Sequence, residues 1–226
     1  MAVIERIFVP CGSHRLEALY SRPAAGPEGR RRGIFVLCHP YPPFGGDMYH
    51  KVVVKTAEAL GEEGFDVLRF NFRGVGRSTG GGGMEVNPIG SREDLERAAA
   101  WARERLPDLP LWVGGYSYGA FIALSSQVPR LAGAFRGRGA VRGVLAVAYP
   151  AGMEAFRLDH LPDLPLALVH GTDDLLASAH GLRRYLETQR TGLAVHWVEG
   201  ANHFFDGKLD RLKEAVRAGA RELAGG

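Results

Sequence analysis

The chain of 226 residues has little cysteine, little lysine and no long apolar run. Its two cysteines, Cys11 and Cys38, exclude the disulfide framework that holds many small secreted domains together. No apolar run approaches the roughly 18 residues that a membrane-spanning helix needs. Residues 1–6 also lack the basic stretch followed by an apolar stretch that marks a secretory signal. These absences predict a cytoplasmic protein with reduced thiols and no membrane partner.

A concentration of positive charge on one surface is also missing. The net charge is +3, and the only basic run, residues 30–32, falls in a loop rich in glycine and proline. We therefore predict no nucleic-acid partner. With 46% hydrophobic and 23% charged residues the composition is that of an ordinary globular protein. We expect a single domain over residues 1–226; a homodimer is possible, but no feature demands it.

Strand-like and helix-like segments alternate along the chain from residue 34 onward. Before them, Ile4–Val9 and Arg15–Ser21 alternate loosely around a turn and predict a hairpin. The later strands are expected at residues 34–38, 66–71, 111–114, 141–148, 164–169 and 194–198, and the helices at 50–63, 92–105, 118–127, 179–189 and 207–223. This order predicts an α/β fold with a mainly parallel sheet and helices on both faces.

One pentapeptide, Gly115-Tyr116-Ser117-Tyr118-Gly119, follows a short apolar strand and precedes a helix. This context is typical of a nucleophilic serine held on a tight strand-to-helix turn with its hydroxyl above the sheet. The flanking glycines are expected where such a turn brings backbone segments close together. A serine here could instead cap the helix. The pentapeptide alone does not separate the two interpretations.

A carboxylate and a histidine follow two other predicted strands. Asp173 and Asp174 come after residues 164–169, and His203 comes after residues 194–198. In a parallel α/β sheet, sites form at the carboxyl ends of strands. A serine hydroxyl needs a base, histidine can take and return the proton, and a buried carboxylate orients the imidazole. The three placements together predict acyl transfer at Ser117.

These motifs resemble those of the α/β hydrolases, and the resemblance covers nearly the whole chain, from Ile34 to the last helix. It is most similar to the small lidless esterases of dienelactone-hydrolase-like character, which implies an eight-stranded sheet without a large lid. The closer likeness is carried by His39-Pro40-Tyr41-Pro42 with Gly45-Gly46, by residues 71–78 and by the pentapeptide. Dienelactone hydrolases proper have cysteine as the nucleophile where this chain has Ser117. The resemblance therefore does not extend to the substrate of those enzymes.

The resemblance implies roles for individual residues. Ser117 is the expected nucleophile and His203 the general base. The family places its acid three residues after the glycine that ends the strand, which gives Asp174, whereas Asp173 is expected to bond the loop backbone. The expected oxyanion hole consists of the backbone N–H groups of Tyr118 and Tyr41.

The remaining residues near the predicted site are aromatic, histidine or glycine. We expect Phe44, Tyr116, Met153 and Phe204 to bind substrate and Phe205 to pack in the core. His39 and His170 are expected to be structural histidines whose polar atoms are satisfied. No spacing matches a common metal site or a phosphate-binding loop, so we expect no metal and no cofactor. Residues 80–83 are expected to form a flexible connection at the rim of the site.

The leading hypothesis is a serine hydrolase acting on small-molecule esters or thioesters of small to medium acyl groups. Only residues 150–162 are available for a flap, so an open cleft is expected. A peptidase or amidase using the same triad is the second hypothesis. A non-catalytic binding module on the same scaffold is the third, and it would favour loss of a triad position.

Overall fold

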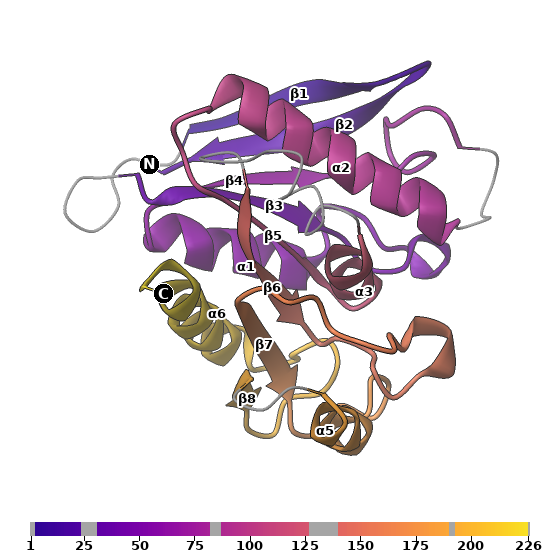
Figure 1. Ribbon diagram of the computed structural model, residues 1–226, viewed down its shortest axis with the longest axis vertical. Coiled ribbons are helices and arrows are strands. Elements are labelled where there is room, and N and C mark those ends of the chain that lie inside the picture. The colour runs from indigo at the N-terminus through magenta and orange to yellow at the C-terminus, as the bar shows by residue number, and fades with distance from the viewer. Residues whose placement is uncertain (1–2, 24–30, 82–86, 127–139, 190–192, 226) are drawn as a thin grey trace.

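The computed structural model describes residues 3–23, 31–81, 87–126, 140–189 and 193–225. In these residues one eight-stranded sheet has the order β1-β2-β4-β3-β5-β6-β7-β8 (Figure 1). Strands β1 (Val3–Cys11) and β2 (His14–Arg22) form the predicted hairpin, and β2 pairs antiparallel with β4 (Phe65–Phe70). All pairs from β4 onward are parallel. The predicted α/β fold with a mainly parallel sheet is therefore confirmed.

The other strands are β3 (Gly33–Cys38), β5 (Leu111–Tyr116), β6 (Val141–Val147), β7 (Leu166–Gly171) and β8 (Ala194–Val198). The helices are α1 (Lys51–Glu62), α2 (Pro88–Arg105), α3 (Tyr118–Ser125), α5 (Ala179–Glu187) and α6 (Leu209–Gly225), with short 3-10 turns η2 (Pro42–Phe44) and η3 (Glu154–Phe156). Every residue of β3, β4, β5 and β7 is buried. Strands covered on both faces need apolar residues on both, which explains their near-continuous apolar runs.

The helices form a layer on each face of the sheet (Figure 1). Leu95 of α2, Phe121 of α3 and Leu182 of α5 belong to one buried cluster. Val53 of α1 and Val216 of α6 belong to a second cluster on the opposite face. The sheet thus has a core on each side, and its strand ends stay free to carry loops.

Most boundaries differ from the sequence prediction by one or two residues, and three differences are the most informative. Helix α2 begins at Pro88 because the Asn87 side chain accepts a hydrogen bond from the N–H of Ile89 (2.9 Å) and proline fits the first turn. Strand β5 continues to Tyr116, directly before Ser117. Strand β7 covers residues 166–171 instead of 164–169, so His170 lies inside the strand. The last two differences bring strand backbone right up to the predicted site.

Within the described ranges, no helix combines the length and apolar character needed to cross a membrane. The cytoplasmic location and the single domain stay predictions. Of the predicted flexible connection at residues 80–83, residues 82 and 83 lie outside the described ones.

Candidate active site

Ser117 lies on a strained turn between β5 and α3. Its backbone has φ 55° and ψ −116°, a conformation that side-chain-bearing residues rarely adopt. The turn is held by the Ser117 N–H, which donates to the Val147 carbonyl at 2.9 Å, and by the Ser117 carbonyl, which accepts from the Ala120 N–H at 2.9 Å. The side chain makes no capping hydrogen bond with α3, so the helix-cap interpretation is wrong.

The two glycines of the pentapeptide lie where backbone segments touch. A Cβ on Gly115 would lie 2.4 Å from the carbonyl carbon and oxygen of Gly119. A Cβ on Gly119 would lie 2.4 Å from the Cys38 carbonyl oxygen. Neither neighbour can move aside easily, because both are backbone. The crowding expected from the sequence is therefore present.

Three side chains from different strand ends form a continuous hydrogen-bonded array. His203 Nε2 lies 3.0 Å from Ser117 Oγ, and His203 Nδ1 lies 2.7 Å from Asp174 Oδ2. Asp174 and His203 are buried, with exposed fractions of 2% and 4%. The structure thus brings together three residues separated by up to 86 positions in the chain.

Asp174 and its neighbour Asp173 have different surroundings. Asp174 Oδ1 accepts a 2.7 Å hydrogen bond from the Ala177 N–H. Burial alone would raise the pKa of Asp174, but the hydrogen bond and charge of His203 and the Ala177 N–H outweigh it and hold the pKa below its ordinary value. Asp173 is exposed and accepts from the Thr172 hydroxyl at 3.0 Å. Asp174 is therefore the carboxylate that contacts His203.

The two predicted oxyanion donors come from neighbouring loops. The Tyr118 N–H is at the start of α3, where the helix dipole favours negative charge, and Tyr41 follows β3. The two rings make an edge contact with centroids 5.4 Å apart. No acceptor in the described part of the chain takes either N–H. Both N–H groups thus remain free to bind a ligand atom.

Tyr116 has a different place from the one predicted. It was expected to bind substrate, but it is 2% exposed, and its hydroxyl donates to the His203 carbonyl at 3.0 Å. Its ring packs against the His203 ring with centroids 5.3 Å apart. Because Tyr116 ends a strand covered on both faces, it supports the His203 loop from beneath and does not line an open cleft.

His50 is a neighbour of the site that the sequence prediction missed. Its ring stacks on Tyr116 with centroids 5.0 Å apart and an angle of 26°. Its Nδ1 accepts from the Val52 N–H at the start of α1. Burial, followed by Lys51, lowers the pKa of His50. No sequence signal could have placed it here, because its position depends on how α1 packs.

Large apolar side chains are exposed on the loops that follow the strand ends. Phe44 is 87% exposed, Phe204 44% and Met153 39%. These are the other three predicted substrate-binding residues. Leu175 and Leu176, directly after Asp174, are 94% and 53% exposed and were missed. An apolar pair in the turn after the predicted acid was the available signal. Phe205 is fully buried, as expected.

The segment between β6 and β7 is held in place by hydrogen bonds and ring contacts. The Tyr149 hydroxyl donates to the Phe156 carbonyl at 3.0 Å and accepts from the Leu158 N–H at 3.2 Å. The Phe156 ring packs against Tyr118 with centroids 5.8 Å apart. The described residues between β6 and β7 contain one 3-10 turn, η3, and form no helical lid.

The other two buried histidines near the strand ends differ from each other. His39 Nδ1 bonds the Pro40 carbonyl at 2.7 Å, and its Nε2 accepts from the Phe72 N–H at 3.0 Å, which confirms a structural role. His170 was expected to be satisfied as well, but neither ring nitrogen has a hydrogen-bond partner among the described residues. That expectation was wrong, because the strand end places the ring against Asp174.

One group of possible metal ligands occurs in the described ranges. Asp94 Oδ1 lies 3.8 Å from Cys11 Sγ and 3.4 Å from His14 Nε2. The same oxygen already accepts from Arg73 Nε at 2.9 Å and Nη2 at 2.7 Å. Burial, followed by Asp94, raises the pKa of the Cys11 thiol to about 11. A thiol that keeps its proton is a poor ligand, so we assign the group a structural role.

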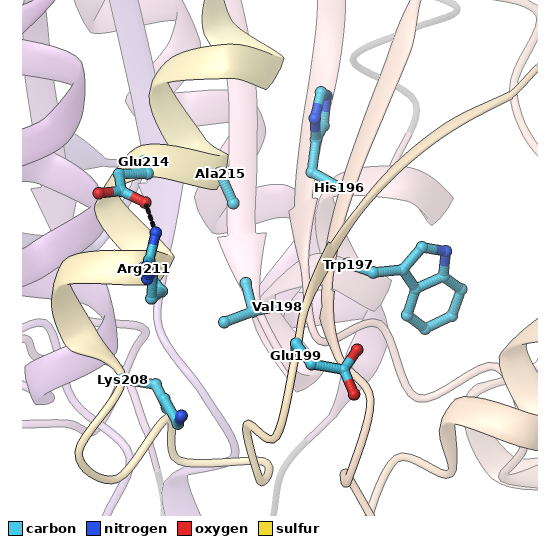
Figure 2. A pocket seen from close by; sticks show the side chains of 8 residues that line it. All are labelled: His196, Trp197, Val198, Glu199, Lys208, Arg211, Glu214 and Ala215. Atoms are coloured by element: carbon cyan, nitrogen blue, oxygen red, sulfur yellow. Dashed lines mark hydrogen bonds and ion pairs between the residues drawn. The ribbon is translucent and has the colours of Figure 1, made fainter.

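A surface cavity of about 490 Å³ lies between β8 and α6 (Figure 2). Its lining includes both signs of charge, with Arg211 bonded to Glu214 at 2.9 Å. Eight residues line it: His196, Trp197, Val198, Glu199, Lys208, Arg211, Glu214 and Ala215. None of them belongs to the predicted site, so this cavity is separate from Ser117.

The sheet order and the Ser–His–Asp array at the strand ends define the class of α/β serine hydrolases. Residues 31–217 match the family model described as "Alpha/beta hydrolase domain". The chain belongs to this family.

Solved structures agree with this assignment. The chain is 29% identical to an alpha-beta serine hydrolase homologue from Coxiella burnetii, covering 95% of this chain and 96% of that one, with a TM-score of 0.81. It is 29% identical to an a/b serine hydrolase without lid from Xanthomonas campestris, with coverages of 97% and 94% and a TM-score of 0.80. A dienelactone hydrolase from Anabaena variabilis shares the fold at 18% identity, with 96% of each chain covered and a TM-score of 0.75. The predicted α/β-hydrolase family and fold are confirmed, and a hydrolase is supported.

Proposed function

We propose that the chain hydrolyses carboxylic esters or thioesters of small to medium acyl groups through an acyl-enzyme on Ser117. The observation that carries the proposal is the array from Ser117 Oγ through His203 to Asp174, held on a strained turn. A hydroxyl 3.0 Å from a neutral imidazole nitrogen can lose its proton as it attacks a carbonyl carbon.

The chemistry follows in two halves. Ser117 Oγ bonds to the acyl carbon, its proton passes to His203 Nε2, and the leaving alcohol or thiol departs with that proton. Water then attacks the acyl-enzyme while His203 takes a proton, and the acid is released as Ser117 regains its hydrogen. Asp174 stabilises the imidazolium in both halves. The Tyr41 and Tyr118 N–H groups are proposed to bind the oxyanion, each contributing about 3 kcal/mol.

The surroundings support acyl groups of limited size. The loops around the strand ends carry the exposed side chains of Phe44, Met153 and Phe204, and the β6–β7 segment forms no lid. An open, apolar rim can hold a short acyl chain, but it does not enclose a long one. We propose that these three side chains contact substrate.

The test is hydrolysis of p-nitrophenyl esters from acetate to palmitate, alongside matching thioesters and anilides. We expect a short-chain optimum and a loss of about 10³-fold or more in kcat for Ser117→Ala. Asp174→Asn should lose a similar factor, because an amide favours the wrong histidine tautomer. Asp173→Asn is the matched control and should keep nearly all activity, since its exposed carboxylate contacts only the loop.

Three outcomes would contradict the proposal in different ways. Ester turnover that survives in Ser117→Ala would exclude this nucleophile. Preference for the anilides would favour a peptidase or amidase. No turnover, together with failure of a fluorophosphonate probe to label Ser117, would favour a binding module on a hydrolase scaffold.

A further inference from the structure

His170 places a second imidazole on the carboxylate of Asp174. The His170 side chain is fully buried at the end of β7, and its Nε2 lies 3.6 Å from Asp174 Oδ2. This is the same oxygen that His203 Nδ1 contacts at 2.7 Å. One carboxylate oxygen therefore faces two histidines, although a triad needs only one.

The groups around His170 determine its protonation state. Asp174, His203, Arg183 and the Ala177 carbonyl are the polar groups that influence its charge, and the ring packs edge-on against Trp197 with centroids 5.7 Å apart. Burial is the largest influence and lowers the pKa of His170 to about 4. The ring is therefore neutral at neutral pH.

A neutral imidazole carries one ring hydrogen, either on Nδ1 or on Nε2. With the hydrogen on Nδ1, the Nε2 lone pair would face the Asp174 carboxylate and repel it. With the hydrogen on Nε2, the positive end of the N–H dipole faces the charge. The separation is too long for a full hydrogen bond, but a dipole acts strongly on a charge in a buried, low-dielectric setting. The Nε2–H tautomer is therefore favoured.

We propose that His170, as the Nε2–H tautomer, is a positioning residue of the triad that holds Asp174 and moderates its charge toward His203. Without this dipole the full charge of Asp174 acts on His203 and stabilises its imidazolium form, which cannot accept the proton of Ser117. His170 thus extends the active range of the site to lower pH. This inference rests on the proposed function only through the role of His203.

The first test observes the tautomer directly. Long-range ¹H–¹⁵N NMR of the full chain should show His170 neutral and protonated at Nε2 from about pH 5 to 8, as a strongly lowered pKa requires. The Nδ1–H tautomer, or titration of His170 near neutrality, would overturn the inference. This measurement does not depend on turnover.

The second test is the pH dependence of Ser117 labelling by a fluorophosphonate probe. His170→Leu fills the buried space without an N–H, whereas His170→Gln can keep an N–H near the Nε2 position. We expect the acid limb to move up by about half a pH unit in His170→Leu and to be restored in His170→Gln. His196→Leu is the control, because His196 on β8 pairs with the neighbouring Val169 and bonds Glu222 instead of Asp174.

The outcomes separate this inference from the proposed function. An unchanged acid limb in a His170→Leu variant with wild-type circular dichroism would overturn the inference alone. An equal shift in His196→Leu would overturn it too, because the effect would then be a general change of the sheet edge. If wild-type Ser117 is never labelled, the proposed function fails, and the NMR measurement still decides the tautomer. If His170→Leu does not fold, the same measurement on the wild-type chain decides the case.

Discussion

At the scale of single residues, backbone strain lies where the candidate site lies. Three residues other than glycine have φ between about +20° and +160° in the described part of the chain: Ser117 (55°), Ala148 (48°) and Phe205 (53°). Ser117 is the proposed nucleophile, Ala148 follows β6, and Phe205 lies two residues after His203. Each such residue costs about 1–3 kcal/mol, which the surrounding core must offset. The strain fixes the reactive geometry before substrate arrives.

The crowding at Gly119 gives a prediction at this scale. Gly119→Ala would place a Cβ 2.6 Å from the Cys38 carbonyl carbon, so the turn must shift and the Tyr118 N–H must move with it. We expect kcat/KM for a short-chain ester to fall about 100-fold. Gly61→Ala is the control, because a Cβ there meets nothing within 4 Å and lies in α1. It should keep activity and raise the free energy of unfolding by about 0.5–1 kcal/mol. Equal activity in the two variants would contradict the prediction.

At the scale of elements, an ion pair with a buried carboxylate joins helix α2 to the loop after β4. Asp94 of α2 is fully buried and accepts from the Arg73 side chain and, at 2.8 Å, from the Arg73 N–H. The next residue, Glu93, also contacts Arg73, at 3.0 Å, but its side chain is 57% exposed. The two carboxylates contact the same arginine but differ in burial and in how many of its hydrogen bonds they accept, so they can be compared.

Replacing each carboxylate tests how firmly the loop is anchored. Asp94→Asn should lower the free energy of unfolding by about 1–3 kcal/mol, because it removes the buried charge partner of the Arg73 guanidinium, whose side chain is 26% exposed and keeps only the exposed Glu93 as a counter-charge. Glu93→Gln should change it by less than about 1 kcal/mol, since exposed ion pairs contribute little. Denaturant unfolding of both variants measures the difference. Similar values would show that burial does not set the strength of this anchor.

At the scale of the whole molecule, buried neutral histidines couple stability to pH. Burial lowers the pKa of His39 to about 3 and that of His170 to about 4, from an ordinary value of 6.5. As pH falls below about 6.5, the unfolded chain binds a proton at each histidine and the folded chain does not. The stability is therefore fully present above that pH and is lost as pH falls toward the folded values.

Each histidine should contribute a slope of about 1.4 kcal/mol per pH unit between roughly pH 6 and 4. Guanidinium unfolding at a series of pH values measures the total slope. His170→Leu should give a total slope that is smaller by the contribution of one histidine. An unchanged slope in His170→Leu would contradict the burial effect.

The sequence by itself determined the sheet, its helical layers and the three strand ends that carry Ser117, Asp174 and His203. Local hydrophobic periodicity shows which faces of a segment are buried by its neighbours, and turn residues show where the segment ends. Packing decided the rest. The close approach of Gly171 to the Ala201 carbonyl, where a Cβ would lie 2.2 Å from the oxygen, brings Asp174 against His203. Packing also places His170 beside that carboxylate, Tyr116 beneath the His203 loop and His50 against the Tyr116 ring. Contacts between residues far apart in the chain depend on register and side-chain volume, which no local pattern contains.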